Sequence, residues 1–396
     1  MATLGLAASA GPTGLAGGPD GVCLRGEVTT LRVFPVRARR LSVTFSAPAL
    51  ARMRQLRLAS SGCQVYPSQT KHCVAINDEI FVFASTLVVY VYSTRTFRLE
   101  KLLSDHENSK TITSICLNHF DTNFLAVATS DGKVSVWNIN AEAICSRVHY
   151  KPGVSVHLTI SWSPSDPDAC ILAACETGAI KILQWDFKQQ QQQQQISSPG
   201  ASTATELVSI KVKSDVNVTA TAWSSGGESS KPLTFALGCS NGIVFLHRPS
   251  DKSHKVLLVK DRTAAVCDVQ WDRLSASVYL LVAYYSFISL WDADAAVELH
   301  VFDKQPGVTS IAFLDWQPGT FLSSNSKSGV LKLWNVSQKT SLSAIKICSE
   351  GGLLAAKVDA ASKNVLCANT NGRWVLVLSS FGLSLVFQHM KEVSPN

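Results

Sequence analysis

The stretch DHENSKTITSICLNHFDTNFLAVATSDGKVSVWN, residues 105–138, decides the fold. Apolar and polar residues alternate in TITSICLN, a mostly apolar run follows in FLAVAT, and KVSVWN alternates again. A period of two is typical of β-strands packed in layers. The segment HFDTN separates the first two strands, and the pair Asp131–Gly132 supplies a tight turn before the third. The stretch therefore predicts three antiparallel strands joined by short turns.

The same unit recurs along the chain at a nearly constant spacing. Tyr92 and Trp137, which each end a third strand, are 45 residues apart, and Trp291 and Trp334 are 43 residues apart. The turn glycines agree, with intervals of 46 residues from Gly132 to Gly178, 43 from Gly329 to Gly372 and 64 from Gly178 to Gly242. The long interval exceeds the usual period by about 20 residues, which matches a glutamine-rich insertion at 188–206.

A repeat of about 40–45 residues that holds four strands and ends in Trp-Asp is typical of a WD-repeat blade. The dipeptide is literal at Trp185–Asp186 and Trp291–Asp292, and it becomes Trp-Asn at Trp137–Asn138 and Trp334–Asn335. The pattern predicts an all-β fold: a seven-bladed WD-repeat β-propeller at residues 59–390, followed by a tail at 391–396. The insertion at 188–206 should be a solvated loop, because a Gln/Ser/Pro tract buries too little apolar surface to fold.

Closure of the ring is the open point of this prediction. The seventh unit takes its fourth strand from LSLVFQH, residues 383–389, and no further strand follows it. Closure then rests on packing between blades, or on an N-terminal segment such as GCQVY, residues 62–66.

Residues 1–58 differ in composition from the rest of the chain. They hold eight arginines, no lysine and two acids, so their net charge is +6. We interpret them as a disordered Ala/Gly/Arg-rich extension. The alternative is a mitochondrial transit peptide, although Pro35 interrupts any amphipathic helix there. Met53 is a second candidate start of translation.

The formal charge of +7 does not predict a nucleic-acid-binding protein. Residues 59–396 contain 28 basic and 27 acidic residues, so the propeller is nearly neutral and has no excess charge with which to release phosphate counterions. A membrane span is not predicted either, because the longest apolar run, residues 278–291, is shorter than the ~20 residues that a helix needs.

The 11 cysteines are predicted to be core residues rather than disulfides or zinc ligands. No Cys-x-x-Cys pair exists, and Cys170 and Cys175 lie five apart on one strand, so they should face opposite sides. Eight cysteines fall in or beside predicted strands: Cys73, Cys116, Cys170, Cys175, Cys239, Cys267, Cys348 and Cys367. Free cysteine packs as a small apolar residue, so a reducing, cytoplasmic location is expected.

The chain from Met53 to about residue 390 resembles WD-repeat proteins. The resemblance rests on MRQLRLASSGCQVYPSQTKHCVAINDEIFVFASTLVVYVY, on the opening stretch and on VTSIAFLDWQPGTFLSSNSKSGVLKLWNVS. More narrowly, these segments resemble the N-terminal propeller of the WD repeat-containing protein 17 family, whose members are considerably longer. The resemblance implies an interaction scaffold without a well-defined biochemical activity.

The family's blade network can be placed on this sequence residue by residue. In typical blades a His, a Ser or Thr, the turn Asp and the third-strand Trp form one hydrogen-bond network. The second unit has His106, Asp131 and Trp137, but Val127 stands at the Ser/Thr position. The sixth unit keeps Ser324 and Trp334 and has Ser328 in place of the Asp. Together with Trp185, Asp186, Trp291 and Asp292, these residues are predicted to be structural.

No enzymatic motif was found, so no catalytic, cofactor-binding or metal-binding residue is predicted. The chain lacks Gly-x-Ser-x-Gly, His-Glu-x-x-His and the P-loop pattern. We expect a non-enzymatic scaffold that binds other proteins on the rims of the propeller, without a cofactor or a small-molecule substrate. The loops after Leu103, Tyr150, Ser214, Lys260, Lys304 and Ser349 should share one rim. The alternatives are an RNA-binding propeller and a module of a transport-coat assembly.

Overall fold

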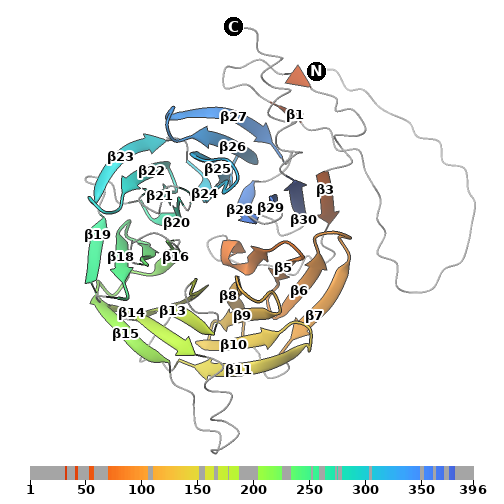
Figure 1. The fold of residues 1–396 in the computed structure, drawn as a ribbon, viewed down its shortest axis with the longest axis vertical. Helices are drawn as coiled ribbons and strands as arrows, with labels where there is room; N and C mark the ends of the chain where they lie inside the picture. The colour runs from red at the N-terminus through yellow and green to blue at the C-terminus, as the bar shows by residue number, and fades with distance from the viewer. Residues whose placement is uncertain are drawn as a thin grey trace, which may run out of the picture.

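A computed structural model shows β-sheets arranged in a ring around a central axis (Figure 1). The structure describes most of residues 70–379, together with three short segments at 32–33, 41–42 and 53–57. The gaps after residue 70 are 106–109, 151–156, 165–167, 177, 187–203, 225–232, 251–252, 258–263, 273, 275–278, 303–305, 348–351, 360–362 and 370–373. Within these described residues the strands form seven sheets.

Six blades follow the predicted plan of four consecutive antiparallel strands, with the first strand nearest the axis (Figure 1). Blades 1 and 2 contain β4 (Val74–Ile76), β5 (Ile80–Ala84), β6 (Val88–Ser93), β7 (Leu99–Ser104), β8 (Ile112–Leu117), β9 (Phe124–Thr129), β10 (Lys133–Asn138) and β11 (Ala143–His149). Blades 3 and 4 contain β12 (His157–Trp162), β13 (Ala169–Glu176), β14 (Ala179–Asp186), β15 (Thr205–Lys211), β16 (Val218–Trp223), β17 (Phe235–Cys239), β18 (Val244–Arg248) and β19 (Ser253–Leu257). Blades 5 and 6 contain β20 (Val266–Trp271), β21 (Tyr279–Tyr284), β22 (Phe287–Asp292), β23 (Val297–Phe302), β24 (Val308–Phe313), β25 (Thr320–Asn325), β26 (Val330–Asn335) and β27 (Thr340–Lys346).

The seventh sheet departs from the predicted plan. It contains β28 (Leu353–Asp359), β29 (Asn364–Asn369) and β30 (Trp374–Ser379), but its fourth strand is β3 (Met53–Arg57) from the N-terminal part of the chain. β3 pairs antiparallel with β30 from Met53↔Leu378 to Arg57↔Trp374. The all-β propeller is therefore confirmed, while the prediction of seven blades of consecutive strands is correct for six and wrong for the last sheet. The segment LSLVFQH, which was predicted to fill this position, lies outside the described residues, as does GCQVY.

Two predicted boundaries move as a result. The N-terminal extension was predicted to end at residue 58, but β3 belongs to the ring because it supplies backbone hydrogen-bond partners to β30. The glutamine-rich insertion was predicted to end at residue 206, but β15 begins at Thr205. The rest of the insertion, from 188 to 203, and the tail at 391–396 lie outside the described residues.

Apolar packing between neighbouring sheets closes the ring. Seven apolar clusters join the described parts of the seven sheets, one cluster for each pair of neighbours. The cluster between the first and the last sheet combines Phe81 and Phe83 of β5 with Ala355 and Leu366 of β28 and β29. The second strands are largely buried, as β9 shows with five buried residues of six, whereas the outer strand β7 is mostly exposed.

Polar side chains on the innermost strands add bonds between blades. Asp268 on β20 is buried, and its carboxylate accepts hydrogen bonds from the backbone N–H groups of Val269, at 3.0 Å, and of Ile311 on β24, at 3.1 Å. Ser310 Oγ bonds with both backbone groups of Ala356 in the next sheet. A buried polar group needs such partners, and here the partner is the neighbouring blade.

Turn chemistry agrees with the sequence prediction. Gly132, Gly178, Gly242 and Gly329 all lie in turns between second and third strands, and all have positive φ, between 63° and 86°. Glycine adopts this conformation without the steric penalty of a Cβ atom. The repeat spacing of the turn glycines therefore had a backbone cause.

Three further elements come from the N-terminal part of the chain. β1 (Arg32–Val33) adds to the outer edge of β27 and pairs with β2 (Leu41–Ser42), so the sixth sheet has six strands. The short 3-10 helix η1 (Thr70–Cys73) packs against the innermost strands β8 and β28. From η1, His72 Nε2 lies 2.8 Å from the backbone oxygen of Thr219 on β16, the first strand of blade 4.

Candidate functional site

The candidate site is a rim of the ring that we call the connection rim. It carries the turns between second and third strands and the connections that lead from each outer strand to the next blade. Backbone hydrogen bonds tie these two kinds of segment together: Ser130 N donates to Thr111 O, Ser240 N to Asn217 O and Ser326 N to Gly307 O. The same bond recurs in blades 2, 4 and 6, so the described parts of the rim are held by the sheets beneath them.

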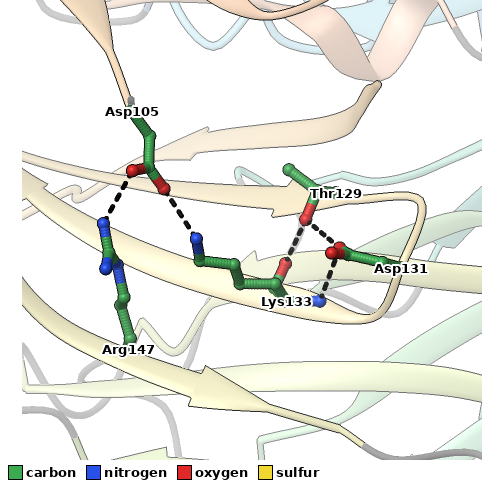
Figure 2. A network of polar contacts seen from close by, with 5 residues as sticks. All are labelled: Asp105, Thr129, Asp131, Lys133 and Arg147. Atoms are coloured by element: carbon green, nitrogen blue, oxygen red, sulfur yellow. Dashed lines mark hydrogen bonds and ion pairs between the residues drawn. The ribbon is translucent and has the colours of Figure 1, made fainter. Parts of the chain in front are cut away.

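Blade 2 shows how charged side chains are fixed on this rim (Figure 2). Asp105, which follows β7, accepts hydrogen bonds from Lys133 Nζ and Arg147 Nη2, both at 2.8 Å. Lys133 begins β10 and Arg147 lies on β11, so one carboxylate from the connection joins two strands of the next blade. The carboxylate offsets part of the charge of the two cations in a partly buried position, which makes this cluster a structural clamp between blades 1 and 2.

Beside the clamp, the turn residue Asp131 holds the hairpin between β9 and β10 (Figure 2). Thr129 Oγ1 donates to Asp131 Oδ1 at 2.6 Å, and Lys133 N donates to the same oxygen at 3.3 Å. Burial alone would raise the pKa of Asp131, but these hydrogen bonds outweigh it and hold the pKa below its usual value. The carboxylate is therefore stabilised in its charged form, as expected for a structural turn residue.

The structure places the predicted network residues of blade 2 only in part. His106 lies outside the described residues. Asp131 bonds to Thr129, which the sequence interpretation did not single out, and Val127 occupies the predicted Ser/Thr position. Trp137 is buried in the apolar cluster between blades 1 and 2.

In blade 6 the serine that binds the tryptophan is one residue away from the predicted one. Trp334 Nε1 donates to Ser323 Oγ at 2.9 Å, whereas Ser324 Oγ lies 2.8 Å from Thr309 Oγ1. Phe321 pairs directly with Trp334, and Ser323 lies two residues further along β25. Because alternate residues of a strand face the same side, Ser323 shares the face of Trp334 and Ser324 does not.

The remaining predicted residues are structural too. Trp185 is fully buried, and Asp186 Oδ1 accepts a hydrogen bond from Gln184 Nε2 at 3.1 Å. Trp291 Nε1 donates to Ser289 Oγ at 2.7 Å, and Asp292 Oδ1 accepts from Ala295 N at 2.9 Å. The same turn cap recurs at Asn138 and Asn335, which accept hydrogen bonds from Ala141 N and Gln338 N. The residue after each N–H donor, Glu142, Ala296 or Lys339, has a φ of 54°–57°. In these three blades the second residue of the Trp-Asp/Asn pair thus fixes the turn after the third strand.

Five of the eight cysteines predicted to be core residues are buried, namely Cys73, Cys170, Cys175, Cys239 and Cys367. Cys116 and Cys267 are partly buried, and Cys348 lies outside the described residues. Cys170 and Cys175 belong to different clusters, on the two faces of β13. Burial raises the pKa of Cys170, and burial together with the nearby Cys175 raises the pKa of Cys239 to about 12. These thiols are therefore protonated near neutral pH and are poor nucleophiles or metal ligands.

Two other kinds of feature are absent from the described part of the chain. No group of three or more His, Cys, Asp or Glu residues is arranged to hold a metal ion there. Within the same residues, no helix has the length and apolar character needed to cross a membrane.

Comparison with known proteins found one family model that matches part of the chain. Residues 97–138 match the family described as WD domain, G-beta repeat. The matched stretch includes β7, the outer strand of blade 1, and ends with the third strand of blade 2 at Trp137–Asn138. It therefore spans two blades, and Asp105 lies inside it at the junction.

Two further similarities were found. Over 90 residues the chain is 29% identical to protein transport protein SEC31 of Yarrowia lipolytica, and this match covers 23% of the chain and 7% of that protein. The fold is similar to a chain in the crystal structure of the mitotic checkpoint complex, with a TM-score of 0.66 and 16% identity. That likeness covers 87% of this chain and 98% of the other, and at this identity it concerns the propeller fold alone.

Proposed function

We propose that this protein is a non-enzymatic scaffold that binds other proteins on the rims of its propeller. The observation that carries the proposal is the recurrent backbone bonding of the connection rim, which fixes loops on a rigid support. Fixed loops lose little conformational entropy when a partner binds, so more of the contact energy contributes to affinity. We also propose that the seventh sheet, with β3 as its outer strand, works as a full blade of this scaffold.

Exposed apolar side chains mark where a partner would contact each rim. Leu87 and Tyr285 lie in turns between second and third strands on the connection rim, and each is 42% exposed. Phe120 and Leu274 lie in turns between first and second strands on the opposite rim, and they are 54% and 48% exposed. Large apolar and aromatic residues of this kind commonly dominate binding energy.

Affinity capture followed by mass spectrometry tests the proposal and identifies the rim. The full chain is compared with two variants, Tyr285→Ser and Phe120→Ser, which remove one exposed aromatic ring from each rim. We expect the full chain to recover a specific set of proteins that one variant loses and the other keeps. Recovery of the same background with all three proteins would contradict the scaffold function.

A transport-coat assembly is the second candidate, and the match to SEC31 is what favours it. In that case the captured proteins should assemble with the chain into large particles, which sedimentation would detect.

The narrower similarity to the WD repeat-containing protein 17 family is likewise a proposal, in which this chain corresponds to the N-terminal propeller of a longer protein. Sequencing of full-length transcripts tests it directly.

We propose a cytoplasmic location for the scaffold. The alternative, import into mitochondria, depends on residues 1–58, whose net charge of +6 resembles that of a transit peptide. Imaging of residues 1–396 and 53–396 separates the two. Mitochondrial signal from the longer form only would replace the cytoplasmic assignment.

A further inference from the structure

The outer edge of blade 6 already carries an added strand. β1 pairs with β27 through Val33↔Ile345 and Arg32↔Lys346, so it covers the last two of the seven residues of β27. An outer strand presents unpaired backbone N–H and C=O groups on its free side, and an added strand satisfies them. β27 is therefore an edge that demonstrably accepts a further antiparallel strand.

The sequence of β27 explains why this edge is receptive. Charged residues along an edge strand protect it from pairing with other chains. The outer strands of blades 1 to 5 each carry a charged residue before their last position; these strands are β7, β11, β15, β19 and β23. In β27, TSLSAIK carries no charged residue before Lys346. β27 is thus the least protected of these outer edges, and it also exposes the apolar side chain of Leu342.

The strand that occupies this edge is short, since only Arg32 and Val33 pair with β27. Blade 6 is basic as a whole: residues 308–347 contain four lysines and one acid, Asp315, and no acid occurs between 316 and 349. A longer strand with acidic residues would be attracted to this basic edge, where β1 contributes only two residue pairs.

We propose that the outer edge of β27 is a strand-addition site for an extended acidic segment of a partner protein, which displaces β1. The backbone groups of β27 supply the pairing, and an acidic residue opposite Lys346 supplies the selectivity. This inference rests on the proposed scaffold function, because it names one place and one chemical class for a partner. β1 acts as a weak built-in competitor that keeps the edge covered until such a segment arrives.

Binding of a synthetic peptide to the full chain tests this site. The probe is a fluorescent ten-residue peptide in which Glu alternates with Val or Thr, followed by anisotropy. We expect Lys346→Glu to weaken binding about tenfold, the factor that corresponds to about 1.4 kcal/mol. Lys211→Glu is the matched control, since Lys211 is the last residue of the outer strand of blade 3, and it should leave affinity unchanged. Circular dichroism confirms that both variants are folded.

Two further variants separate strand addition from simple charge attraction. Val33→Pro disfavours strand β1, because proline has no N–H to donate to a ladder. It should strengthen binding of the peptide by removing the competitor. A peptide with proline at alternate positions keeps the charge and loses the donors, so it should not bind. Equal binding of both peptides, or an unchanged affinity of Val33→Pro, would overturn the proposal.

The remaining outcomes are also decisive. If a single-stranded RNA oligonucleotide binds with the same dependence on Lys346 and displaces the peptide, blade 6 is a nucleic-acid surface instead. If affinity capture recovers specific proteins equally with the wild type and Lys346→Glu, the scaffold function is supported and the strand-addition site at β27 is rejected. If the peptide binds as described but capture recovers no protein, the strand-addition site is supported and the scaffold function is rejected.

Discussion

Removal of β3 should open the ring, and the structure allows the effect to be estimated. β3 forms five residue pairs with β30, which corresponds to about five backbone hydrogen bonds. At about 1 kcal/mol net for each bond, the loss is about 5 kcal/mol. Natural domains have only about 5–15 kcal/mol of stability in total, so the truncated ring should be close to unfolding.

The experiment compares residues 53–396 with residues 58–396, each carrying an initiator methionine. Both lack β1 and β2, so they differ only in β3. Urea unfolding is followed by the fluorescence of the nine tryptophans. With a denaturant slope of about 3 kcal/mol per molar, the shorter protein should unfold at a urea concentration about 1.7 M lower. A synthetic peptide that contains MRQLR should raise the midpoint again when it is added to the shorter protein.

Equal midpoints for the two proteins would refute this reasoning. In that case another segment would complete the seventh sheet, and LSLVFQH at 383–389 is the one that the sequence pattern favours. Deletion of residues 383–396 from the shorter protein would then lower the midpoint.

Three further perturbations follow from the described contacts. Asp268→Ala leaves the N–H of Ile311 without its acceptor and should lower the free energy of unfolding in urea by about 2–3 kcal/mol. Asp268→Asn keeps one oxygen acceptor and should lower it by about half as much. Equal losses for the two variants would argue against the bridge between blades 5 and 6. Gly352→Ala would place a Cβ atom against the backbone oxygen of Ser326 and should lower the free energy of unfolding by about 3 kcal/mol or more. Gly319 has a φ of +66° but nothing within 4 Å, so Gly319→Ala should lower it by about 1 kcal/mol. A larger loss for Gly319→Ala than for Gly352→Ala would contradict the packing. Because the pKa of Asp131 is lower in the folded state than in the unfolded chain, its contribution is full above the unfolded value of about 3.9 and is lost as the pH falls through the folded value. The stability difference between the wild type and Asp131→Asn should therefore shrink as urea unfolding is repeated from pH 6 down to pH 3, and a constant difference would refute the assignment.

The sequence predicted the parts of the fold that depend on local pattern. Alternation in TITSICLN and KVSVWN and the turn glycines identify strands and hairpins, because side-chain direction and positive φ are set within a few residues. Alternation does not say which edge a strand joins. LSLVFQH shows the pattern more clearly than MRQLR does, yet MRQLR is the segment that pairs with β30, 325 residues away at Met53↔Leu378.

The candidate site was predictable in kind but not in detail. The turn residue Asp131 and the Trp-Asp/Asn pairs were found because they recur with the repeat. The serine partner of Trp334 was assigned one residue too far, since a shift of one position along a strand changes the face. The clamp at Asp105 was missed, because its two partners lie 28 and 42 residues further along the chain and only the folded blade brings them together.

The pairing of β3 with β30 also determines when the ring can close during biosynthesis. Met53 leaves the ribosome long before its partner Leu378 has been made. At about 5–20 residues per second, the 325 residues from Arg54 to Leu378 take about 15–65 s to translate. Throughout that interval β3 has no strand to pair with, and the first blades have no last sheet beside them. The nascent chain should therefore depend on chaperones until its final strands emerge, and a stalled or shortened transcript should yield an open, aggregation-prone ring.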